Sequence, residues 1–164
     1  MTNKSRGYSP LQVVLHWTIA ALVIFQLLVN GGMQDAFDDL LNGDPIEEMN
    51  WALLHIGVGV TVLLLAIVRV LARWRLGAPP HEGTSQLVRW ISWLTHLLLY
   101  GFIFFMPSTG ALAWFFGIEF SAELHELGRL ILIPLIGLHV IGGLVEHFVF
   151  QNDTLMRMLR LEQE

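Results

Sequence analysis

Cysteine is absent from this 164-residue chain, and charged residues make up only 14% of it. Without cysteine there is no disulfide framework, no thiolate metal site and no iron–sulfur cluster. A charged fraction of about 25% is usual in soluble proteins, so this composition argues against an ordinary water-soluble enzyme. The low charge content and the formal net charge of -5 also argue against nucleic acid as a partner, because a nucleic-acid binder needs a basic face.

Catalytic motifs are also missing. The chain has no glycine-rich nucleotide loop after a strand and no nucleophile elbow. Residues 1–10 are polar and contain no apolar leader, so we expect no cleavable signal peptide.

Long apolar stretches are what the sequence has instead. A helix that crosses a bilayer needs about 20 apolar residues, and four stretches reach that length: residues 11–29, 51–70, 90–116 and 124–150. Pro107 lies inside the third stretch, where it predicts a kink. The sequence therefore predicts an all-α protein, a four-helix transmembrane bundle that forms a single domain over residues 1–164.

The charged residues are sorted between the two ends of this predicted bundle. Eight of the nine lysines and arginines fall at one end, and nine carboxylates fall at the other. The basic residues are Lys4, Arg6, Arg69, Arg73, Arg75, Arg89, Arg157 and Arg160, and the acidic residues are Asp35, Asp38, Asp39, Asp44, Glu47, Glu48, Glu119, Glu123 and Glu126. Because basic residues favour the inner side of a membrane, we expect both termini to be cytoplasmic.

Histidines are the ionisable residues that occur at membrane depth. His81 falls in a polar connection and is expected to be exposed to solvent. The other six lie in or near spans, at an inner level (His16, His96, His139, His147) or an outer level (His55, His125). Ionisable side chains in hydrocarbon are costly and usually mark function, although a single membrane histidine is more often an interhelical hydrogen bond.

The spacing of these histidines predicts two pairs. His125 and His139 are 14 residues apart, which places them on one helix face about 21 Å apart along the axis. His16 matches His139 in depth, and His55 matches His125. Two bis-histidine sites, one in each leaflet, are therefore expected.

Haem is the ligand that suits such pairs best. Zinc takes three or four protein ligands, and no additional carboxylate is expected near His16 or His139. Haem iron takes two axial ligands and needs an apolar slot between helices. Small residues near the candidate ligands could form that slot: Gly57, Gly59, Gly137, Gly142 and Gly143. Two alternatives stay open: His96 in place of His16 as a ligand, and a haem-free bundle whose histidines bind protons or a metal.

Five segments of the chain resemble a known family. They are YSPLQVVLHW around His16, LLHIGVGVTVLLLAIVRVLAR around His55, THLLLYGFIFFMPSTGAL around His96, HELGRLILIPLIGLH from His125 to His139, and HFVFQNDTLMRML at the end. Over about residues 8–159 the sequence is similar to the prokaryotic cytochrome b561 family of four-helix, di-haem b membrane cytochromes. The resemblance implies a multi-pass protein of the bacterial cytoplasmic (inner) membrane. It also implies one haem b held by His16 and His139 on the cytoplasmic side and a second held by His55 and His125 on the periplasmic side.

The same resemblance implies electron transfer from a periplasmic donor to ubiquinone, with superoxide as one candidate donor. Two features depart from the superoxide-oxidising members. The outer connection between the last two spans is short, with His96 and His125 only 29 residues apart. The outer face is acidic, which would repel an anion and attract a basic protein. The alternative prediction is therefore a haem b membrane-anchor subunit that relays electrons between the quinone pool and a basic periplasmic redox protein or dehydrogenase.

Five further residues are candidates for supporting roles. Arg69 and Arg129 are each placed to bind haem propionates, or to extend a charged head to the membrane surface. Glu146 and His147 are candidates for proton delivery to a quinone, and His147 could instead stabilise the helix end. His96 is a candidate to bind a propionate or the quinone.

Overall fold

The computed structural model describes residues 7–29, 31–79 and 85–159 of the chain. These residues form six helices and contain no strand: α1 (Pro10–Leu28), α2 (Met33–Asn42), α3 (Met49–Leu76), α4 (Gln86–Phe116), α5 (Glu119–Phe148) and α6 (Thr154–Leu159). Helices α1, α3, α4 and α5 are long and apolar enough to cross a membrane. The predicted all-α transmembrane bundle is thus confirmed.

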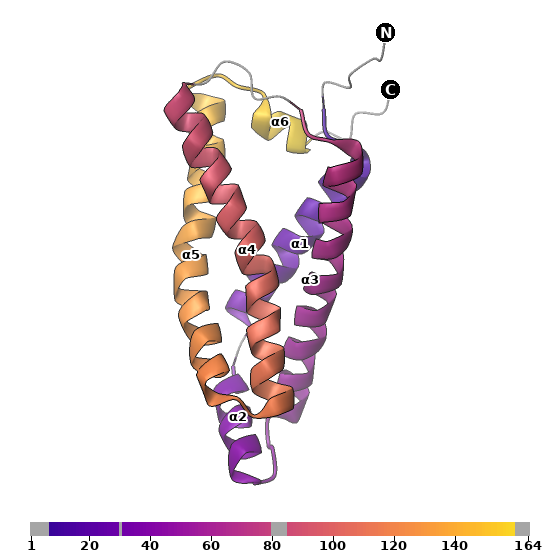
Figure 1. The fold of residues 1–164 in the computed structure, drawn as a ribbon, viewed down its shortest axis with the longest axis vertical. Helices are drawn as coiled ribbons and strands as arrows, with labels where there is room; N and C mark the ends of the chain where they lie inside the picture. The colour runs from indigo at the N-terminus through magenta and orange to yellow at the C-terminus, as the bar shows by residue number, and fades with distance from the viewer. Residues whose placement is uncertain (1–6, 30, 80–84, 160–164) are drawn as a thin grey trace.

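The long helices run up and down between two ends of the molecule (Figure 1). Helix α1 begins, α3 ends, α4 begins and α6 lies at one end, whereas α2 and the α4–α5 turn lie at the other. Four residues named in the sequence analysis lie outside the described residues: Lys4, Arg6, His81 and Arg160. The cytoplasmic placement of the basic end stays a prediction, as does the single domain.

Local sequence signals account for most helix ends. Ser9 and Ser85 cap the starts of α1 and α4, where their side chains accept hydrogen bonds from the backbone amides of Gln12 and Val88, three residues further along. Gly43 and Gly117 end α2 and α4 in the left-handed conformation (φ of 75° and 65°), which glycine adopts without steric cost. Helix α3 continues to Leu76, beyond the predicted end at residue 70, and Arg73 and Arg75 lie in its last turn, where positive charge stabilises a helix C-terminus.

Two short helices do not follow from the apolar pattern. Helix α2 falls in the segment 30–50, which is polar and was expected to connect two spans. It packs against α3, and its Ala36 is fully buried. Helix α6 packs against α5, and Met158 of α6 accepts a hydrogen bond from Nε1 of Trp17 at 2.7 Å. Helix α4 is continuous through Pro107, and α5 through Pro134.

Small side chains and a few larger ones such as Leu15 and Leu132 share the buried contacts between the long helices, and many large apolar side chains face outward. Helix α4 packs against α5, α1 against α3, and α3 against α4. Ala52 and Ala66 of α3 are fully buried, whereas Leu64, Leu130 and Ile141 are each 59% exposed. Close backbone approach at small residues and an apolar exterior are typical of helix packing in lipid. The consequence for the site is a bundle whose centre is left open.

Candidate functional site

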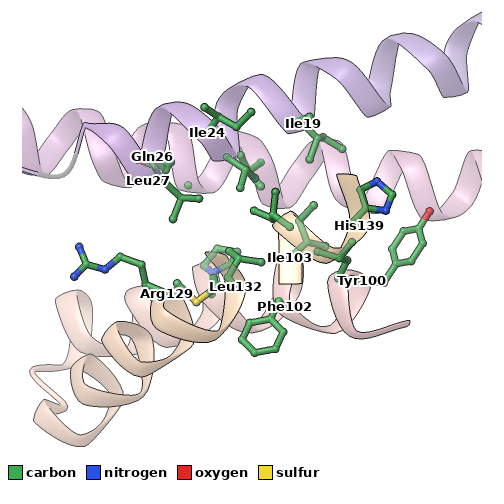
Figure 2. Close-up of a pocket in the computed structure, with 18 of the residues that line it drawn as sticks. Ile19, Ile24, Gln26, Leu27, Tyr100, Phe102, Ile103, Arg129, Leu132 and His139 are labelled. Atoms are coloured by element: carbon green, nitrogen blue, oxygen red, sulfur yellow. The ribbon is translucent and has the colours of Figure 1, made fainter. Parts of the chain in front are cut away.

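A cavity of about 1300 Å³ occupies the middle of the bundle. It is lined by residues of all six helices, and it exceeds the roughly 300–1,000 Å³ of an ordinary small-molecule pocket. Figure 2 shows Arg129 toward one end of this cavity and His139 with Tyr100 toward the other, with apolar side chains such as Ile103 and Leu132 between them. The cavity is mainly apolar, with a few polar groups that converge on it at two levels.

The outer level holds the rings of His55 from α3 and His125 from α5. Their centroids lie 6.1 Å apart, with an angle of 69° between the ring planes. Both side chains line the cavity. The Nδ1 of His55 is buried and has no hydrogen-bond partner among the described residues, which leaves Nε2 as the nitrogen open to the cavity.

The ring of His125 is held by α4. Its Nδ1 lies 2.8 Å from the backbone oxygen of Met106 and 3.2 Å from Oγ1 of Thr109. A carbonyl can only accept, so Nδ1 carries the proton and Nε2 keeps the lone pair that a metal ion would bind. Gly110 makes room for the ring, because a Cβ at this position would lie 3.1 Å from Cε1 of His125. Ser121 of α5 donates a further hydrogen bond to α4, to the Thr109 backbone oxygen at 2.9 Å.

The inner level brings three imidazoles together. The centroids of His16 and His139 lie 6.1 Å apart at an interplanar angle of 67°, which closely matches the outer pair. His96 of α4 lies nearer to His139, with a centroid distance of 5.0 Å. Its Nδ1 lies 2.6 Å from the Ser92 backbone oxygen one helical turn earlier, so this nitrogen donates and Nε2 is again the lone-pair side.

These distances fit haem better than they fit a small metal centre. A bond from a first-row metal ion to an imidazole nitrogen is about 2.0–2.1 Å, and the ring centroid lies about 1.1 Å beyond the nitrogen. Two imidazoles on opposite sides of one iron would therefore have centroids about 6.3 Å apart, close to the value of both pairs and larger than the His96–His139 distance. Among the described residues, no group of three or more histidine, aspartate or glutamate side chains could hold a metal ion.

The two arginines predicted to bind propionates both line the cavity, one at each level. Nη1 of Arg69 donates to the Gln12 backbone oxygen at 3.1 Å, which fixes the side chain between α3 and α1. Nη2 of Arg129 lies 4.0 Å from a carboxylate oxygen of Glu126, and the Arg129 side chain is 38% exposed. Arg129 is therefore the more loosely held of the two.

Glu146 and His147 occupy different surroundings although they are adjacent in sequence. Glu146 is only 5% exposed and lines the inner part of the cavity. His147 is not among the cavity-lining residues. Its ring contacts Phe148 at a centroid distance of 4.8 Å, and its Nδ1 lies 3.4 Å from the Asn152 backbone oxygen. The structure thus brings one of the two predicted proton donors to the site and not the other.

Of the five glycines expected to form the apolar slot, some line the cavity and others do not. Gly59, Gly142 and Gly143 line the cavity, whereas Gly57 and Gly137 do not. Sequence reasoning missed Gly110, Thr109 and Gln26, all three of which are near the outer histidines. A glycine or a polar side chain inside an apolar span is the signal that could have identified them.

Four apolar spans around a central cavity, with imidazoles paired at two levels, define a helical-bundle membrane protein that holds a prosthetic group between its helices. The chain belongs to the prokaryotic cytochrome b561 family, whose family model matches residues 7–161. It is a bacterial membrane haem protein of this electron-transfer family, and the family resemblance predicted from the sequence is confirmed.

Three curated relatives are similar over nearly their whole length. Cytochrome b562 of Cereibacter sphaeroides is 34% identical over 155 residues, covering 94% of this chain and 96% of that protein. A protein of Yersinia pestis named probable superoxide oxidase CybB is 25% identical over 177 residues, covering 94% and 96%. Cytochrome b561 homolog 2 of Escherichia coli K12 is 24% identical over 186 residues, covering 96% and 94%.

Proposed function

We propose that this protein is a di-haem b electron carrier in which His55 and His125 hold the outer haem and His16 and His139 hold the inner one. The observation that carries this proposal is the geometric match of the two pairs, each with a ring-centroid distance of 6.1 Å. His96, at 5.0 Å from His139, is assigned to the surroundings of the inner haem and is not a ligand.

When bound, each haem supplies an iron that takes up and releases one electron. The chain's own residues prepare the site for it. The apolar lining excludes water, Arg69 presents a guanidinium at the inner level for a propionate, and Arg129 does so at the outer level. The two levels give electrons a route through the bundle from one end to the other.

We further propose that electrons run from a periplasmic donor to ubiquinone at the basic, cytoplasmic end of the bundle in the inner membrane. Reduction of a quinone consumes protons as well as electrons. Glu146 is buried at the inner part of the cavity, where a carboxyl group can pass a proton inward. His96 and Tyr100 also line this part of the cavity and offer hydrogen-bonding groups to a quinone. His147, which does not line the cavity, has no role in this proposed proton path.

Two candidate electron donors at the outer face differ in charge. The name of the Yersinia relative points to superoxide. Its match spans 177 residues, more than the 164 of this chain, so that relative contains residues missing here. The exposed carboxylates Asp35, Asp44, Glu47 and Glu48 would repel an anion and attract a basic protein. These observations favour the second candidate function, a membrane anchor that receives electrons from a basic periplasmic redox protein or dehydrogenase.

Haem content and donor preference test the proposal together. We expect the purified protein to contain two haems b per chain and to show sharp α-bands on reduction with dithionite. His55→Ala and His16→Ala should each lose one haem and keep the other, whereas His96→Ala should keep both. In vesicles loaded with ubiquinone, a basic donor should reduce the protein faster than superoxide does. A colourless preparation, or loss of a haem in His96→Ala but not in His16→Ala, would refute the ligand assignment.

A further inference from the structure

Gln26 links the last turn of α1 to the residue that carries an outer imidazole. Its Nε2 donates a hydrogen bond to the backbone oxygen of His55 on α3 at 2.8 Å. Gly59 lies one turn further along α3, and a Cβ there would lie 3.4 Å from the same Nε2. Glycine at this position therefore leaves room for the amide to lie against α3 beside His55.

Two buried polar atoms at this contact have no hydrogen-bond partner among the described residues. They are Oε1 of Gln26 and Nδ1 of His55. Buried polar groups are nearly always hydrogen-bonded, and an exception calls for an explanation. An amide oxygen only accepts, and a protonated Nδ1 donates, so the two atoms are complementary. They belong to residues that one hydrogen bond already joins.

His125, the other imidazole of the outer pair, has a hydrogen bond at Nδ1, which His55 lacks. Nδ1 of His125 donates to the Met106 backbone oxygen, and that bond fixes which nitrogen faces the cavity. Histidines that bind a metal almost always donate their other ring N–H to an acceptor, which raises their basicity as ligands. Nδ1 of His55 has no acceptor among the described residues, and Oε1 of Gln26 is an unbonded acceptor on the side chain that already contacts the His55 backbone.

We propose that Gln26 is the positioning residue of the outer haem site: its Oε1 accepts the Nδ1–H hydrogen bond of His55 once the iron fixes the ring, with Nε2 anchored on the His55 carbonyl. This inference rests on the proposed ligand role of His55. A basic imidazole stabilises ferric iron, so the Gln26 bond lowers the reduction potential of the outer haem relative to a site without it.

The experiment is a spectroscopic redox titration of the purified holoprotein, resolved into two one-electron components. Gln26→Leu removes the acceptor, and Gln26→Glu keeps an oxygen at the same reach. Gln12→Leu is the matched control, because Gln12 on the first turn of α1 makes the same kind of bond, from Nε2 to the Gly77 backbone oxygen at 2.8 Å. The largest g value of the low-spin ferric signal is recorded in parallel, since it responds to the basicity of the axial imidazole.

We expect Gln26→Leu to raise the reduction potential of one component. The ratio of reduced to oxidised haem at a fixed potential should change about tenfold, which corresponds to about 59 mV for one electron. Gln26→Glu should stay at or below the wild-type potential, and Gln12→Leu should leave that component unchanged. Equal shifts in both components, or a Gln26→Leu protein that matches Gln12→Leu, would overturn the inference. If Gln26→Leu does not fold, Gln26→Met must show the same rise. A preparation without haem would refute the proposed function itself, whereas two haems with unmoved potentials would refute only the role of Gln26.

Discussion

At the scale of single residues, the four paired histidines differ mainly in what holds their rings. His125 is fixed from α4 by a backbone carbonyl, by Thr109 and by the space that Gly110 leaves. His55 is held at its backbone by Gln26, while its ring nitrogen stays unbonded. The ligand with a prearranged ring needs less reorganisation when a metal binds. His125 is therefore the residue around which we expect the outer site to assemble.

Gly110→Ala tests this arrangement. The new methyl group would lie 3.1 Å from Cε1 of His125, so the ring must shift by a few tenths of an ångström from its present position. We expect weaker binding of the outer haem, by about 10-fold as for other outer-shell changes at metal sites, with the inner haem retained. Haem content after gel filtration measures this effect.

Gly101→Ala is the control on the same helix, because a Cβ there meets nothing within 4 Å. Equal haem loss in both alanine variants would show that helix α4 itself is sensitive to substitution, and that Gly110 has no particular role at His125.

At the scale of elements, α2 and the residues that follow it determine what the outer end of the bundle presents. Helix α2 packs against α3, and its residues, Asp35 and Asp38 among them, line the outer part of the cavity. Asp44, Glu47 and Glu48 are exposed and lie together with Asp35 and Asp39 around a small surface pocket. A cluster of one sign raises the local concentration of partners of the opposite sign.

Reversing two of these charges should slow a basic electron donor. We expect the double variant Asp44→Lys, Glu47→Lys to lower the second-order rate constant about tenfold at low ionic strength, since steering of this kind changes association rates by about 10–10³. The difference should nearly vanish at about 1 M salt, where the screening length is about 3 Å. Stopped-flow mixing with a small basic redox protein gives the rate.

Asp153→Lys makes the same change of charge sign at the opposite end of the molecule, before α6. It should leave the rate unaltered. A donor rate that is independent of salt in the wild-type protein would remove the case for a basic partner.

At the scale of the whole molecule, the bundle surrounds a cavity where many proteins have a dense core. No large side chain among the described residues is fully buried, and the fully buried residues of the spans are alanines such as Ala52 and Ala66. A cavity of about 1300 Å³ forgoes the packing contacts that would otherwise hold the helices together. A cofactor that fills it contributes directly to the stability of the fold.

Removal of haem should therefore destabilise the protein strongly. A ligand present at 1,000 times its dissociation constant stabilises the folded state by about 4 kcal/mol, and each of two haems would contribute an amount of this order. We expect the thermal loss of helical circular dichroism in detergent to move to lower temperature in His55→Ala and further in the double variant His55→Ala, His16→Ala. Identical midpoints for wild type and double variant would contradict a structural role for the cofactor.

Much of the architecture could be predicted from the sequence. Hydropathy gave the four spans, and the ends of α1 and α4 agree with the predicted boundaries within a few residues. Helices α2 and α6 could not be predicted, because they are short and are stabilised by contacts with α3 and α5 and not by an apolar run of their own. The candidate ligands were named from depth along each helix, and their role as ligands stays a prediction.

The sequence by itself determined the apolar spans, the division of charge between two ends and the level of each histidine, because these depend only on helix rise and on which residues are apolar. The tertiary structure decided how the helices are rotated and which groups meet across them. It placed the Met106 carbonyl against His125, Gln26 against His55, and Glu146 but not His147 on the cavity. Such contacts join residues far apart in the chain, and they are set by the packing of whole helices, which no local pattern encodes.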